Sequence, residues 1–137
     1  MVQDAKELMQ DTLPHQLAEA WLNAKLNGEQ TVQSFYTIEE LAQTPISSSV
    51  RNIVGQACTE MLLGRFEESR DTLQQAFQRS PDSLDAIVGA IICSNLTGRD
   101  ASEYEEALDM AREEHPFLRL REEASERFDL AAQKYVI

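Results

Sequence analysis

VRNIVGQACTEMLLGRFEESRDTLQQAFQRSP, residues 50–81, contains two apolar stripes with the spacing of α-helices. The first stripe consists of Ile53, Ala57, Met61 and Leu62, and the second of Phe66, Ser69, Leu73, Ala76 and Phe77. Gly64 lies between the stripes and can adopt the left-handed backbone conformation that ends a helix. Pro81 cannot continue the second helix. The segment therefore predicts a helical hairpin, with the small residues Ala57, Ser69 and Ala76 where its two helices approach closely.

The same punctuation recurs along the chain. Glycines stand at Gly28, Gly64 and Gly98, with spacings of 36 and 34 residues. Prolines that end the following helix stand at positions 45, 81 and 116. Two interleaved series with this period are typical of the tetratricopeptide repeat, a helix pair of about 34 residues. The sequence thus predicts an all-α fold, a tetratricopeptide-type α-solenoid of antiparallel helix pairs. We expect one domain, residues 1–137, with repeats at 14–45, 50–81 and 84–116.

The two ends of the chain differ from these repeats. Residues 117–137 predict a charged C-terminal capping helix, because a stack of repeats needs a polar outer face at its end. Its expected contacts with the repeats are Leu118, Leu120, Phe128 and Leu130. Residues 1–12 carry a short apolar stripe and predict the second helix of a truncated repeat. We therefore expect a fragment or shortened form of a longer solenoid, whose apolar edge is exposed or covered by a partner.

Charge and composition exclude several classes of partner. The chain has 24 acidic and 12 basic side chains, a net charge of −12. A field of this sign repels phosphate backbones and anionic lipids, so we expect no nucleic-acid binding. The sequence has no run of about 18 apolar residues, so we expect no direct membrane insertion. Cys58 and Cys93 form no CxxC motif, and we expect both to be buried, reduced thiols.

The residues that catalysis would need are scattered. His15 and His115 lie on different predicted units, and no zinc, phosphate-binding or serine-nucleophile motif is present. Adjacent glutamates such as Glu67 and Glu68 point about 100° apart on a helix, as solvated surface residues do. The sequence therefore predicts no catalytic, cofactor-binding or metal-binding residues, and a protein that is not an enzyme.

The remaining candidate site is the inner, concave face, which the first helix of each repeat lines. The candidate partner-binding residues are Arg51, Val54, Cys58, Met61, Leu62, Asp85, Val88, Ile92, Asn95 and Leu96. They are mostly apolar, so we expect the groove to bury an apolar strand, hairpin or helix of another protein. A clamp for a C-terminal carboxylate would need inward cations and amides instead. The alternative for each residue is that it only packs against the adjacent repeat.

Several combinations of residues resemble a known family. They are Leu17-Ala18-Glu19-Ala20-Trp21, Gly55-Gln56-Ala57-Cys58, Gly64-Arg65-Phe66-Glu67-Glu68, His115-Pro116-Phe117 and the terminal Phe128-Asp129 with Tyr135. In this order they resemble the C-terminal half of the epsilon subunit of the COPI coatomer. The helix after Gly98 is about two residues shorter than this family leads us to expect.

The resemblance implies a function and a partner. It implies a structural coat subunit that binds and stabilises the alpha subunit through its C-terminal domain and contacts other coat subunits indirectly. It also implies Golgi-to-ER retrograde and intra-Golgi transport, with a cytoplasmic protein peripheral on the cytosolic face of Golgi membranes and coated vesicles. The competing interpretation is a generic tetratricopeptide adaptor that binds an unrelated peptide or protein.

Overall fold

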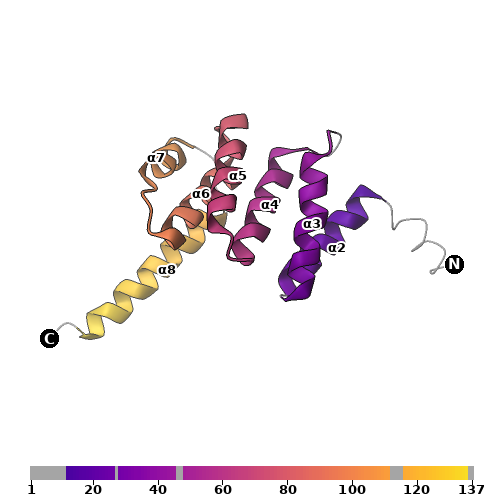
Figure 1. Ribbon diagram of the computed structural model, residues 1–137. Helices are drawn as coiled ribbons and strands as arrows, with labels where there is room; N and C mark the ends of the chain where they lie inside the picture. Colours follow the sequence, from indigo (N-terminus) through magenta and orange to yellow (C-terminus); the bar gives the residue numbers. More distant parts are fainter. Residues whose placement is uncertain (1–11, 27, 46–47, 112–115, 136–137) are drawn as a thin grey trace.

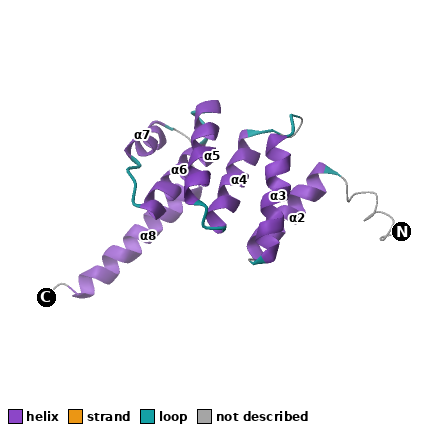
Figure 2. Cartoon of the chain, viewed as in Figure 1, coloured by secondary structure: helices purple, strands orange, loops and turns teal. Residues whose placement is uncertain are grey.

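The structure of the chain is a computed structural model that describes residues 12–26, 28–45, 48–111 and 116–135 (Figure 1). Its α-helices are α2 (Leu13–Leu26), α3 (Glu29–Gln43), α4 (Val50–Leu62), α5 (Phe66–Arg79), α6 (Leu84–Thr97), α7 (Ser102–Met110) and α8 (Pro116–Ala132). A short 3-10 helix, η1 (Gln133–Tyr135), follows α8. Figure 2 shows helices and loops, and no strand occurs in the described ranges.

The helices form successive pairs. α2 contacts α3, α4 contacts α5 and α6 contacts α7, while α4 also contacts both α3 and α6. Figure 1 shows the pairs side by side from α2 to α7. Each pair turns at a glycine with positive φ, namely 70° at Gly28, 76° at Gly64 and 66° at Gly98. The prediction of an all-α solenoid of helix pairs is confirmed.

Small residues bring the two helices of a pair together. Ala57, Ser69 and Ala76 are fully buried. The Ser69 hydroxyl on α5 donates a hydrogen bond of 2.8 Å to the Ala57 carbonyl on α4. In the preceding pair, the Ser34 hydroxyl on α3 donates to the Ala20 carbonyl on α2 at 2.7 Å. The same polar contact thus fixes the close packing of both pairs.

Two glycines inside helices permit close contacts that the sequence analysis did not single out. A Cβ atom on Gly89 of α6 would lie 2.7 Å from the Leu73 Cδ2 atom on α5. A Cβ atom on Gly55 of α4 would lie 3.1 Å from the Trp21 Cζ2 atom on α2. Each glycine therefore sets the distance between neighbouring helix pairs.

The C-terminal helix departs from the predicted cap. Phe117 and Leu118 in its first turn pack against the buried cluster of Ile87, Val88, Ile91 and Leu108. Beyond that turn α8 runs away from the stack (Figure 1). The prediction that Leu120, Phe128 and Leu130 contact the repeats is wrong, because these side chains are 59% to 72% exposed. The reason lies in α7, which has 9 residues against 15 in α3 and 14 in α5 and so offers a following helix little surface.

Two further predictions concern the N-terminal segment and the two cysteines. Residues 1–11 lie outside the described residues, so the proposed helix of a truncated repeat is not tested there. Both cysteines are free thiols, and Cys93 is buried as predicted. Cys58 is only half-buried, and it packs at the border of the cluster of Val54, Ala76 and Ala86.

Candidate partner-binding surface

The ten predicted partner-binding residues lie on α4 and α6, two helices in contact. Six of them are exposed, namely Arg51, Leu62, Asp85, Ile92, Asn95 and Leu96. Cys58 and Met61 are half-buried. Val54 and Val88 are buried. The predicted set therefore contains both surface positions and core positions.

The two valines belong to the core of this chain. Val54 packs with Ala76 of α5 and Ala86 of α6. Val88 packs with Ile87, Ile91 and Leu108. Val54 therefore joins α4 to α5 and α6, whereas Val88 joins α6 to α7, and both lie in the core beneath the exposed residues.

Cys58 on α4 and Asp85 on α6 interact electrostatically between the two helices. Burial raises the pKa of the Cys58 thiol, and the negative charge of Asp85 on α6 raises it further. Cys58 also packs against the cluster of Val54, Ala76 and Ala86. The thiol is thus neutral at physiological pH and acts as a small apolar side chain.

An apolar ladder follows the first helix of each pair. Leu26, Leu62 and Leu96 each stand two residues before a turn glycine and are between 56% and 61% exposed. One helical turn earlier, Leu22, Cys58 and Ile92 occupy equivalent positions. Equivalent positions of stacked repeats face the same side of a solenoid. We call these six residues the leucine ladder; five of them are exposed aliphatic side chains and the sixth is the half-buried Cys58. Exposed aliphatic residues in register are typical of a protein-binding surface.

Leu22 and Leu26 are not among the ten predicted residues, which belong only to the second and third repeats. The period of the turn glycines is the signal that locates both residues. Leu22 lies 36 residues before Cys58, and Leu26 lies 36 residues before Leu62, the distance that separates Gly28 from Gly64. The contact between Trp21 and Gly55 joins α2 to α4, so the surface extends over all three pairs.

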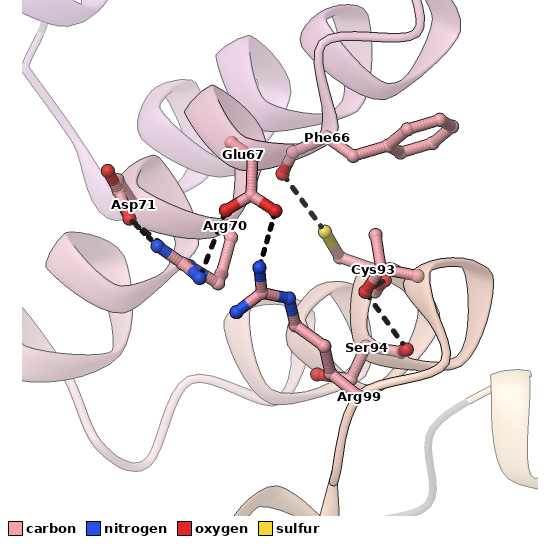
Figure 3. Close-up of polar contacts among 8 residues, drawn as sticks. Phe66, Glu67, Arg70, Asp71, Cys93, Ser94 and Arg99 are labelled. Carbon is pink, nitrogen blue, oxygen red and sulfur yellow. Dashed lines mark hydrogen bonds and ion pairs between the residues drawn. The ribbon is translucent and has the colours of Figure 1, made fainter.

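A charged cluster lies where α5 meets the end of α6 (Figure 3). Glu67 accepts a hydrogen bond of 2.5 Å from Arg99 and pairs with Arg70 at 3.0 Å. Arg70 also donates to Asp71 at 2.9 Å. Each arginine is therefore engaged by a carboxylate of the same chain. Such exposed ion pairs contribute about 0–1 kcal/mol each, so the cluster links two helix pairs without forming an anion site.

The described residues offer neither a metal site nor a membrane span. In that part of the chain, no group of three or more His, Cys, Asp or Glu side chains is placed to hold a metal ion. None of the helices described is long and apolar enough to cross a membrane.

Comparison with known proteins identifies the family. The profile of the coatomer epsilon subunit family matches residues 1–136. Coatomer subunit epsilon-1 of Arabidopsis thaliana is 25% identical over 131 residues, which cover 95% of this chain and 44% of that protein. Coatomer subunit epsilon-2 of Oryza sativa subsp. indica is 25% identical over 129 residues, covering 93% of this chain and 43% of its own length. The chain spans less than half the length of these curated relatives, and it belongs to the coatomer epsilon subunit family.

Proposed function

We propose that the chain is a non-catalytic structural subunit of the COPI vesicle coat and binds the coatomer alpha subunit through the leucine ladder. The exposed ladder is the observation that carries this proposal. Its aliphatic side chains are costly to leave in water, at about 25 cal/mol for each Å² of apolar surface. A partner that covers the ladder recovers this free energy, whereas a ligand for catalysis needs convergent polar groups.

The chemistry of the ladder restricts the partner. Leu62 and Leu96 are aliphatic, and Cys58 of the same ladder carries a neutral thiol, whose pKa is raised by burial. Arg51 and Asp85 supply one positive and one negative charge at the equivalent position of their repeats. Such a surface fits an apolar hairpin, strand or helix better than a charged tail. The family membership makes the C-terminal domain of the alpha subunit our choice of partner, with other coat subunits bound through it.

The cellular role follows from this partner. We propose action in Golgi-to-ER retrograde and intra-Golgi transport, on the cytosolic face of Golgi membranes and coated vesicles. The net charge of −12 opposes direct attachment to anionic lipids, so membrane association would come through the other coat subunits.

Co-expression with the C-terminal domain of the alpha subunit tests the proposal. We expect a stoichiometric complex on gel filtration, which Leu62→Asp or Leu96→Asp weakens at least tenfold while circular dichroism stays unchanged. Leu130→Asp is the matched control, because Leu130 is equally exposed but lies on α8. Absence of a complex, or equal loss of affinity in the control, would reject the alpha-subunit proposal. Capture of a chaperone tail instead would favour a generic adaptor.

A further inference from the structure

The exposed apolar side of α8 has no cover in the described part of the chain. Apolar residues recur along this helix at spacings of three and four, which places them on one side. They are Phe117, Leu120, Ala124, Phe128 and Ala131. Phe117 packs against the core, whereas Leu120 and Phe128 are 59% and 72% exposed. We call Leu120, Ala124, Phe128 and Ala131 the α8 stripe.

A second apolar surface is open at the same end of the stack. A groove of about 570 Å³ lies between the end of α5, the start of α6 and α7. Its apolar lining includes Phe77, Leu84, Ile87, Ala107 and Met110. Met110 is 79% exposed despite its apolar side chain. We call this surface the end groove.

The repeat register shows that the two surfaces are complementary. Ala86 and Ala90 of α6 stand 34 residues before Leu120 and Ala124 of α8. Both alanines are buried against the preceding helix pair, where Ala90 contacts Leu73 and Ala86 contacts Ala76.

The receiving surface repeats at the same interval. Thirty-four residues after Leu73 and Ala76 come Ala107 and Met110, which line the end groove. The α8 stripe and the end groove therefore have the positions of two surfaces that pack together one repeat earlier. They remain apart within one chain, because α8 leaves the stack after its first turn (Figure 1).

The charges beside the two surfaces are opposite. At about 100° per residue, Arg121 borders one edge of the α8 stripe, and Arg127, which lies 3.9 Å from Glu123 of the same helix, borders the other. Asp82 lines the end groove, and α7 carries Glu103, Glu105, Glu106 and Asp109 with no basic residue. Like charges would oppose docking by several kcal/mol, whereas this arrangement favours it.

We propose that two copies of the chain associate reciprocally, with the α8 stripe of each copy seated in the end groove of the other. A two-fold arrangement covers both apolar surfaces of both copies. The alternative arrangement, in which α8 folds back onto the groove of its own chain, would cover them in a monomer. The inference does not depend on binding to the alpha subunit, because it uses neither Leu62 nor Leu96.

Sedimentation equilibrium of the full chain tests the association. We expect a species of twice the chain mass of 15.5 kDa to appear between about 1 and about 300 µM protein. A monomer over the whole concentration range would overturn the proposal. If hydrogen exchange then showed the α8 stripe protected in the monomer, α8 would be folded onto the groove of its own chain.

Three variants test the contact surfaces. Leu120→Ser with Phe128→Ser removes the stripe, Met110→Glu blocks the groove, and each should weaken association at least tenfold. Leu130→Ser is the control, since Leu130 is exposed on α8 outside the stripe. Mixing the stripe variant with the groove variant should restore a heterodimer, because one intact stripe then meets one intact groove. Dimers that survive either variant, equal loss in the control, or no recovery on mixing would overturn the proposal.

Discussion

Replacing each of two helix glycines by alanine should have opposite effects on stability. Gly55 and Gly89 both lie inside helices, where alanine is favoured over glycine by about 1 kcal/mol. The added Cβ atom meets different neighbours at the two sites. At Gly89 it would lie 2.7 Å from Leu73 Cδ2, and at Gly55 it would lie 3.1 Å from Trp21 Cζ2.

The freedom of those neighbours determines the sign. Leu73 is 1% exposed and packs among Ala57, Ala90 and Cys93, so it has little room to move. Overpacking of such a core costs about 1–3 kcal/mol, which leaves Gly89→Ala destabilised by about 0–2 kcal/mol. Trp21 is 43% exposed, and its ring can shift by a few tenths of an ångström. Gly55→Ala should therefore be neutral or more stable by up to about 1 kcal/mol.

Urea unfolding followed by far-ultraviolet circular dichroism measures both free energies. Adding Leu73→Ala provides a second check, because the new methyl group of Gly89→Ala would partly fill the cavity. The two substitutions should then be coupled by about 0.5–3 kcal/mol in a double-mutant cycle. The reasoning is refuted if Gly89→Ala is the more stable of the two glycine variants, or if the cycle is additive.

Two further predictions concern buried polar groups. Ser69→Ala removes the 2.8 Å hydrogen bond to the Ala57 carbonyl and should cost about 0.5–1.5 kcal/mol in urea, whereas Thr37→Ala on the exposed side of α3 should cost less. Glu60 is 3% exposed, its Oε1 atom accepts a 2.9 Å hydrogen bond from Gln56, and its Oε2 atom accepts none from the residues described. Burial foremost raises the pKa of this carboxyl, so its contribution to stability is full below the usual carboxyl pKa and is lost as pH rises through the raised pKa. Glu60→Gln should therefore be more stable at about pH 7, with the difference shrinking towards about pH 4, and an equal difference at both pH values would contradict this account.

The sequence predicts the helix pairs because their ends are locally encoded. Gly28, Gly64 and Gly98 each need a backbone conformation that other residues resist, so the turns can be located without knowing the packing. Local encoding does not extend to contacts between pairs. Val54 and Leu62 are both apolar residues of α4, yet one is buried and the other exposed, because the neighbouring α6 covers one side of the helix.

The C-terminal helix illustrates the second limit. The spacing of Leu120 and Phe128 predicts that α8 has one apolar side, which another surface should bury. This prediction needs only the sequence of the helix itself. It cannot show which surface provides the cover, since that depends on the length of α7 and on the direction in which α8 leaves the stack.

The pairing of neighbours has a consequence for how the chain unfolds. The main contacts of the described helices lie within a pair or between adjacent pairs, so the middle pair, α4 and α5, has a neighbouring pair on both sides while α2 lies at one edge of the described stack. In such an array stability is a sum of nearest-neighbour terms, and opening begins at the ends and spreads inwards. A partner that touches Leu26, Leu62 and Leu96 together would add a link that spans all three pairs. Binding would then make the array open as one cooperative unit rather than pair by pair.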